Sequence, residues 1–137
     1  MIDHTGVIVS DFSTSKEWYG LALASIGYAK LMEFSEEDTG TAEVVGFGEL
    51  ATNKPDFWVV AATKERPVNH PQLHIAFRAE NYKQVDDFYT AAIKAGGRDN
   101  GKPGPRPHYH ANYYGAFVLD PDGHNIEVVC HSYVPVV

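Results

Sequence analysis

His4, His74 and Glu127 are three of the side chains in this sequence that could bind a metal ion or move a proton. Glu127 lies in a run of β-branched residues that predicts a strand, where glutamate is uncommon and is rarely buried without a partner. Two interpretations of Glu127 are open. Its strand face is solvated, as in many antiparallel sheets, or the face lines a cup in which the carboxylate binds a metal or acts as a general base.

The residues that precede Glu127 predict a tight turn. The sequence Asp-Pro-Asp-Gly at 120–123 suits a type I turn, because proline presets φ and glycine accommodates the exit from the turn. The flanking runs, 114–119 and 125–131, are therefore predicted to be the two strands of a hairpin. On the second strand Glu127 faces away from Cys130, which we expect to be a small core residue.

The chain contains an internal repeat with an offset of 70 residues. A histidine, an aromatic pair and a helix-ending glycine recur in one register: His4, Trp18-Tyr19 and Gly27, then His74, Phe88-Tyr89 and Gly97. A repeat of this size indicates a duplicated supersecondary unit, since each half has too little apolar surface to close a core alone. Two such halves, packed about a pseudo-twofold axis, would bring the two histidines and Glu127 to a shared concavity.

Alternation and helical spacing predict similar elements in both halves. The first half has strands at 2–10, 28–34, 42–50 and 57–62, a helix from Ser13 to Gly27 and an acidic flexible stretch at 35–40; the second has a strand at 73–79 and a helix at 80–95 before the hairpin. The predicted fold is α+β, with two β-α-β-β-β modules that form a cupped mixed β-sheet and carry their helices on the outer face. Residues 1–137 are predicted to form a single domain, with module one at about 1–64, a linker at 65–71 and module two at about 72–132.

Charge and composition limit the partners. A net charge of −7, with no lysine or arginine cluster, argues against nucleic acid or an anionic membrane and favours a small molecule. The single cysteine excludes an internal disulfide and is typical of a reducing compartment. No long apolar run and no leader segment is evident, so we expect a cytoplasmic protein.

The opening strands and the closing turn carry a resemblance to a known family. Residues 2–5, residues 73–77 and the Asp-Pro-Asp-Gly-x-x-x-Glu signature at 120–127 resemble the vicinal oxygen chelate (VOC) superfamily, also called the glyoxalase/bleomycin resistance protein/dioxygenase family. The resemblance covers nearly the whole chain and implies that His4, His74 and Glu127 hold one divalent metal ion. It also implies a homodimer, because many short members pair.

The donor chemistry agrees with a metal site of this kind. Two imidazoles and one carboxylate leave coordination positions open, an arrangement suited to Fe(II) and tolerant of Mn, Ni, Co or Zn. A substrate with two adjacent oxygens would chelate such an ion, which would then act as a Lewis acid. A metal-free descendant of the family is the alternative.

The sequence departs from the family pattern at one position. Glyoxalase I enzymes use a fourth ligand, a carboxylate on the last strand of the first module, but here the resemblance aligns Trp58 with that place. This argues against standard four-ligand glyoxalase I chemistry. Trp58 is predicted to form a wall of the substrate site, or to be a large packing residue.

Further candidates lie in the second module. Residues 101–110 are rich in proline and glycine and predict an irregular loop over the cup, in which His108 would contact substrate and His110 would act as acid or base. Either of two residues, Tyr113 and Tyr114, is a candidate proton donor. The alternative for this stretch is a solvated loop with edge aromatics.

Three other basic residues are considered as candidates for the site. Arg78 shares strand parity with His74 and is a candidate for binding an anionic substrate, although side chains at strand ends often reach solvent. His124 and His131 are expected at the surface.

Functions of different classes remain open at this point. The first is a metalloenzyme, either a glyoxalase-like lyase or isomerase or an extradiol-type dioxygenase, since one scaffold supports many reactions. The alternative is a non-catalytic protein that sequesters a small molecule, such as a bleomycin-type drug, in an aromatic cleft. Fosfomycin-type thiol transfer is disfavoured because the only basic residues evident for a phosphonate are Arg78, Lys102 and Arg106.

Overall fold

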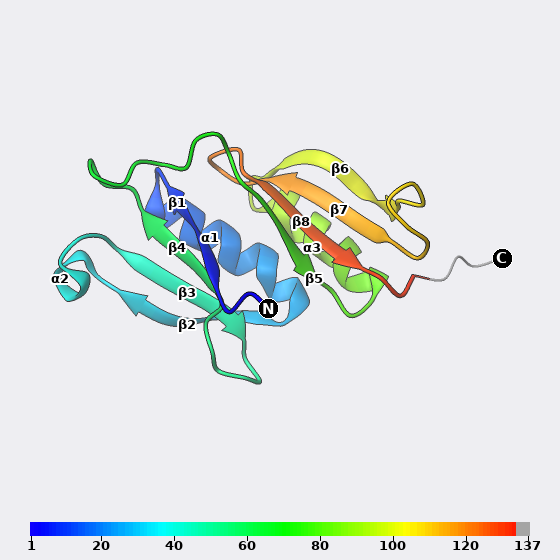
Figure 1. The fold of residues 1–137 in the computed structure, drawn as a ribbon, viewed down its shortest axis with the longest axis horizontal. Coiled ribbons are helices and arrows are strands. Elements are labelled where there is room, and N and C mark those ends of the chain that lie inside the picture. The colour runs from blue at the N-terminus through cyan, green and yellow to red at the C-terminus, as the bar shows by residue number, and fades with distance from the viewer. Residues whose placement is uncertain (134–137) are drawn as a thin grey trace.

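The computed structural model describes residues 1–133, which form two successive modules of the same type (Figure 1). The first module comprises β1 (Thr5–Val9), α1 (Phe12–Leu23), the short 3-10 helix η1 (Ala24–Ile26), β2 (Tyr28–Phe34), α2 (Glu36–Thr39), β3 (Val44–Glu49) and β4 (Phe57–Ala61). The second comprises β5 (His74–Arg78), α3 (Tyr82–Lys94), β6 (Arg98–Pro105), β7 (Tyr114–Leu119) and β8 (Asn125–Cys130). The predicted α+β fold with two β-α-β-β-β units is confirmed.

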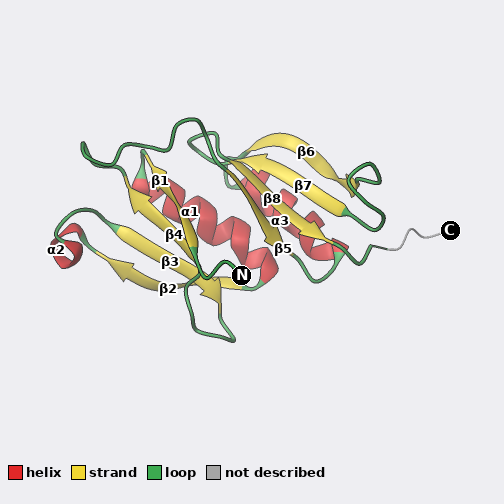
Figure 2. Ribbon diagram, in the orientation of Figure 1, coloured by secondary structure: helices red, strands yellow, loops and turns green. Residues whose placement is uncertain are grey.

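The two modules have the same strand order. The first sheet is ordered β1-β4-β3-β2 and the second β5-β8-β7-β6. In each sheet the opening strand pairs in parallel with the closing strand, and the remaining neighbours are antiparallel. Figure 2 shows α1 and α3 behind the two sheets, which leaves one face of each sheet free of helices. We call this the open face, and His74 and Glu127 lie on it.

The helix ends follow from local chemistry. Asp11 caps α1 by accepting a hydrogen bond from the Thr14 amide at 3.0 Å, and Asn81 caps α3 by accepting one from the Gln84 amide at 3.0 Å. Such caps satisfy backbone donors that have no partner within the helix. Gly27, with φ of 82°, ends η1 in the left-handed conformation that favours glycine.

The apolar core is continuous between the modules. Trp18 on α1 donates its indole Nε1–H to the Ala92 carbonyl oxygen on α3 at 3.0 Å. Phe57 on β4 packs edge-on against Phe77 on β5, with 5.1 Å between ring centroids. Cys130 is buried, as predicted. These contacts hold the two modules together from behind the sheets.

Two segments differ from the sequence-based prediction. Residues 98–105 form the strand β6, whereas the prediction placed an irregular loop at 101–110. Pro103 and Pro105 are compatible with this strand because β6 is at the edge of its sheet, where a missing amide donor leaves no neighbour unpaired. Residues 36–39 form the short helix α2 within the stretch predicted to be flexible, because Ser35 and Asp38 form a capping box.

The turn at 120–124, which we call the closing turn, binds the second module to the first. Tyr19 on α1 donates its hydroxyl to Asp120 Oδ2 at 2.6 Å. The backbone amide of Ser10 donates to the Asp122 carboxylate. His124 is 0% exposed, so the expectation of a surface position was wrong. Its Nδ1 accepts from the Leu73 amide at 3.1 Å, and this tertiary contact was not visible in the local sequence.

Candidate functional site

His74 and Glu127 lie next to each other on the open face of the second sheet. In the parallel pairing of β5 with β8, Ala76 lies opposite Glu127, so His74 is two residues away on the same face. His74 Nε2 is 2.9 Å from Glu127 Oε2. The Glu127 residue is only 2% exposed, whereas the His74 side chain is 53% exposed. A buried carboxylate thus meets an imidazole that solvent and ligands can reach.

Tyr113 completes the pairing of Glu127. Its hydroxyl donates to Glu127 Oε1, so each carboxylate oxygen has one partner. Gly115 makes room for this contact, because a Cβ there would lie 3.2 Å from the Tyr113 ring and 3.4 Å from Glu127 Oε1. Burial and the hydrogen bond to Glu127 raise the pKa of the Tyr113 phenol, so it keeps its proton at neutral pH.

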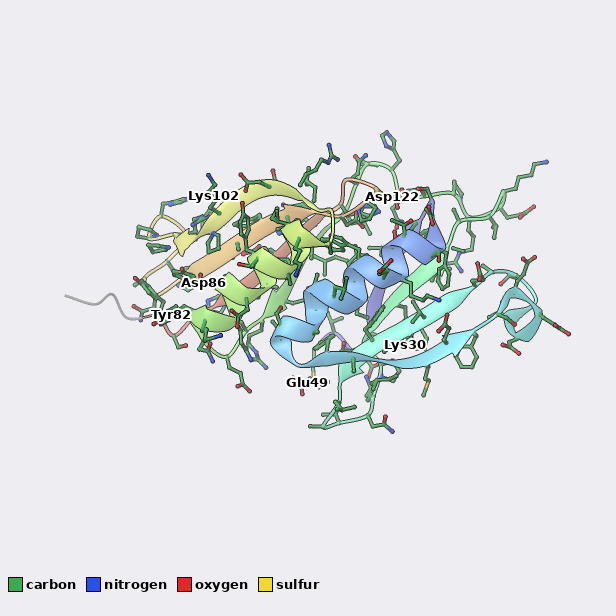
Figure 3. All side chains as sticks on the ribbon, turned by 180° about the vertical axis from the view of Figure 1, so that it is seen from behind. Lys30, Glu49, Tyr82, Asp86, Lys102 and Asp122 are labelled. Carbon is green, nitrogen blue, oxygen red and sulfur yellow. The ribbon has the colours of Figure 1, made fainter. Side chains whose placement is uncertain are left out.

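Tyr114 lies on the opposite face of its strand. Its hydroxyl donates to Asp86 Oδ1 on α3 at 2.7 Å, and its ring packs against Tyr82 and Tyr133. Figure 3 shows Tyr82 and Asp86 on α3, on the helix side of the molecule. Of the two tyrosines proposed as proton donors, the structure therefore brings only Tyr113 to Glu127.

His110 in the loop after β6 pairs with His131, which follows β8. His110 Nε2 and His131 Nδ1 are 2.8 Å apart, and the two rings are stacked with 21° between their planes. His110 also packs edge-on against Tyr113, with 5.0 Å between centroids, so it borders the Glu127 group. His108 is exposed and contacts Tyr109. The His131 contact was missed because the partners are 21 residues apart and only the fold of the loop joins them.

His4 lies apart from this group. It precedes β1, its side chain is 62% exposed, and its Nδ1 is 2.8 Å from Asp3 Oδ1. Both His4 and His74 line a cavity of about 420 Å³ between β1 and β5, which we call the central cavity. Arg78 lines the same cavity. However, within residues 1–133 the ligand atoms of His4, His74 and Glu127 do not all come within 4.8 Å of one another.

Another trio in the closing turn meets that distance criterion: Asp120, Asp122 and His124. The ligand atoms of this trio already accept hydrogen bonds from other groups of the protein. His124 Nδ1 accepts from a backbone amide, so in the neutral ring Nε2 carries the proton and has no free lone pair for a cation. Asp120 accepts from the Tyr19 hydroxyl and from two backbone amides. The trio is a candidate cation site by distance, but its hydrogen bonding is that of a structural turn.

Trp58 lies on the open face of the first sheet. Its indole lies over Gly46, where an added Cβ would be 2.8 Å from indole Cζ3. The indole is partly exposed and lines a cavity of about 490 Å³, which we call the Trp58 cavity. His4 lines this cavity, and so do Arg66 and Asn69 from the segment after β4. Sequence reasoning did not identify the last two, since neither lies in a recognisable motif.

A model of the Glyoxalase/Bleomycin resistance protein/Dioxygenase superfamily matches residues 1–128. No curated protein sequence matches the chain. Several solved structures share the fold. A glyoxalase/bleomycin resistance protein from Albidiferax ferrireducens T118 is 24% identical with a TM-score of 0.73, over 93% of this chain and 96% of that one.

Two further structures have the same fold. A glyoxalase/bleomycin resistance protein/dioxygenase family enzyme from Burkholderia phytofirmans PsJN is 18% identical with a TM-score of 0.65, over 94% of this chain and 97% of that one. A glyoxalase I variant from Zea mays is 20% identical with a TM-score of 0.67, over 93% of this chain and 46% of that one. At these identities the likeness concerns the fold.

Proposed function

Because the chain belongs to the glyoxalase/bleomycin resistance protein/dioxygenase superfamily, we propose that it is a metalloenzyme whose substrate is a small molecule with adjacent oxygen atoms. His4, His74 and Glu127 are the proposed ligands of one divalent ion. The observation that carries the proposal is the 2.9 Å contact between His74 Nε2 and Glu127 Oε2 on the open face. Among the residues described, no helix is long and apolar enough to cross a membrane.

The donor set fits a first-row divalent ion. A buried carboxylate and an accessible imidazole on adjacent strands hold two donor atoms at fixed positions, and a second imidazole leaves coordination positions for substrate. The Tyr113 hydroxyl donates a hydrogen bond to Glu127 Oε1 and so orients the carboxylate, as hydrogen bonds to metal ligands commonly do. When bound, the ion supplies Lewis-acid polarisation of a substrate oxygen.

The protein's own groups supply the proton chemistry. Glu127 is the proposed proton acceptor, because it is a carboxylate that lies 2.9 Å from the exposed His74 imidazole on the open face. Tyr113 is proposed as the proton donor; its one hydroxyl proton is in the hydrogen bond to Glu127 Oε1, so donation to a substrate oxygen would first break that bond. His110, against the Tyr113 ring, and the exposed His108 are proposed to border the substrate.

His4 is proposed to come from a second copy of the chain. Figure 1 shows β1 and β5 running in opposite directions near the middle of the molecule, so β1 starts on the lower side of this view and β5 on the upper side. His4 and His74 are at these starts. A twofold dimer would place the β1 start of one copy beside the β5 start of the other and would form two equivalent sites. The exposed Met1 and Ile2 next to His4 favour such a contact.

Elemental analysis of protein purified without chelator tests the metal site. We expect about one divalent ion per chain, and we expect His74→Ala and Glu127→Gln to lose it. Asp122→Asn is the matched comparison, because it alters the closing-turn trio without touching the proposed ligands. Retention of metal in His74→Ala, or its loss only in Asp122→Asn, would contradict the proposed ligand set.

The element found directs the reaction assay. Oxygen consumption that depends on Fe(II) would indicate an extradiol-type dioxygenase, whereas activity with redox-inert Zn(II) would indicate a lyase or isomerase. A second candidate function is sequestration of a small molecule, favoured by the aromatic Trp58 cavity. This function is expected if the native protein takes up no metal after incubation with Fe(II), Mn(II), Ni(II), Co(II) or Zn(II).

A further inference from the structure

The Trp58 cavity differs in charge from the protein as a whole. The chain has 18 acidic residues against 11 lysines and arginines, yet no carboxylate lines this cavity of about 490 Å³. Its walls are apolar and aromatic, from Ile8, Val44, Trp58 and Val60. Its volume is that of a site for a small organic molecule. The few polar side chains of the cavity therefore determine which kind of polar group a ligand must carry.

Arg66 is the charged group of the cavity. Within residues 1–133 its guanidinium makes no ion pair and no hydrogen bond, while its backbone is held by Thr63. Glu65 lines a neighbouring hollow of about 310 Å³, but it does not pair with Arg66. Arg106 is different, because its guanidinium donates to the carbonyl oxygens of Gly104 and Lys102 at 2.8 and 2.7 Å. Arg66 is thus free to bind an anion.

Asn69 adds a second donor. Its Oδ1 accepts a hydrogen bond from the Ile8 amide at 2.8 Å, on the edge of β1 that no strand pairs. This contact orients the side chain, so the Nδ2 group is left to donate. A guanidinium fork and an amide donor that line one cavity suit a carboxylate, which accepts bidentate hydrogen bonds. No lysine lines the cavity, and a single arginine suits one negative charge better than a phosphate.

We infer that the Trp58 cavity binds an aromatic carboxylate, with its ring on the Trp58 indole and its carboxylate on Arg66 and Asn69. Gly46 below the indole makes room for Trp58 against the sheet. His4 lines the same cavity, so the far end of the ligand would lie toward the proposed metal ligands. This inference names the substrate class of the proposed enzyme and in that respect rests on the proposed function.

Calorimetric titration of the 137-residue chain, treated with chelator, tests the inference separately from the metal. The probes are benzoate, phenylacetate and 2-naphthoate, each compared with its neutral amide. We expect at least one acid to bind at millimolar concentration, about tenfold more tightly than its amide. Arg66→Gln should weaken binding of the acid about tenfold and change binding of the amide little. Trp58→Ala should weaken both ligands.

Two arginine variants serve as controls. Arg98→Gln removes the same charge from the other module and should leave binding unchanged. Arg78→Gln removes the arginine of the central cavity. The inference is overturned if no acid binds, if Arg66→Gln and Arg98→Gln have equal effects, or if Arg78→Gln alone abolishes binding. Metal content measured on each variant before the chelator treatment separates this failure from failure of the proposed metal site.

Discussion

His74 Nε2 and Glu127 Oε2 lie 2.9 Å apart although 53 residues separate them in the sequence. The parallel pairing of β5 with β8 creates this contact, and Tyr113 occupies the other oxygen of the carboxylate. A buried glutamate with both oxygens paired to neighbouring side chains is expected to tolerate an isosteric amide better than an apolar residue, because an amide can still form hydrogen bonds.

Glu127→Gln should therefore separate stability from metal binding. With chelator present, urea denaturation should show a loss of about 1 kcal/mol in the free energy of unfolding, since one charge-assisted hydrogen bond is weakened. Metal uptake should fall sharply, since the anionic ligand is removed. A variant that bound the ion as tightly as the native chain would exclude Glu127 as a ligand.

Mixed dimers test whether the site is shared between copies. His4→Ala and His74→Ala should each abolish metal binding when expressed alone. Co-expressed with different affinity tags and purified as a heterodimer, they should regain one site per dimer, because His4 of one copy meets His74 and Glu127 of the other. A heterodimer without metal would place all three ligands of each site in one chain and contradict the shared arrangement.

Tyr113→Phe and Tyr114→Phe form a matched pair. Each removes a hydroxyl that donates to a carboxylate, Glu127 in one case and Asp86 in the other, so each should lower the free energy of unfolding by about 1 kcal/mol. Only Tyr113→Phe should also reduce turnover and metal affinity, because only Tyr113 contacts Glu127. Equal catalytic losses in both variants would assign the effect to general destabilisation.

Asp120 should give the native protein a distinctive pH dependence. Burial raises its pKa above 3.8, so the folded state holds this proton more tightly than the unfolded state. The contribution of Asp120 to stability should therefore fall as pH rises from 3.8 through the raised folded pKa. Urea denaturation of the native chain and of Asp120→Asn should be compared from about pH 4 to pH 7. As pH rises, the free energy of unfolding of the native chain should fall relative to that of Asp120→Asn.

Asp38 is the control with the opposite sign. The Ser35 backbone hydrogen bond holds the pKa of the Asp38 carboxyl below 3.8. Its stabilising effect should be present above that pH and be lost as pH falls through the lowered folded pKa, so the difference between Asp38→Asn and the native chain should persist from about pH 7 down to about pH 4 and shrink only below 3.8. The same trend in both variants would contradict the different environments of the two carboxyls.

Two glycines should respond oppositely to alanine. A Cβ at Gly97 would lie 2.5 Å from Val118 Cγ1 and 2.9 Å from Trp18 Nε1, so Gly97→Ala should destabilise the protein by about 1–3 kcal/mol. A Cβ at Gly20, inside α1, meets only the Phe47 ring at 3.8 Å. Gly20→Ala should stabilise by about 0.5–1 kcal/mol through helix propensity. Thermal melts in chelator check both changes.

The sequence alone determined the duplicated architecture. The offset of 70 residues between His4 and His74 is a property of spacing, and alternation placed Glu127 opposite the core-facing Cys130. The repeat can be read from spacing along the chain, and alternation depends only on neighbours within a few residues, so neither feature needs the tertiary structure. The edge strand β6 escaped prediction because its prolines argue against a strand until the position at the edge is known.

Only the tertiary structure decided how the modules meet. Parallel pairing brought His74 to Glu127, and the opposite directions of β1 and β5 kept His4 apart (Figure 1). The contacts of Tyr113 with Glu127, of His124 with Leu73 and of Asn69 with β1 join residues 14, 51 and 61 positions apart. Such contacts depend on packing between elements and on buried hydrogen bonding, for which a local sequence pattern has no signal.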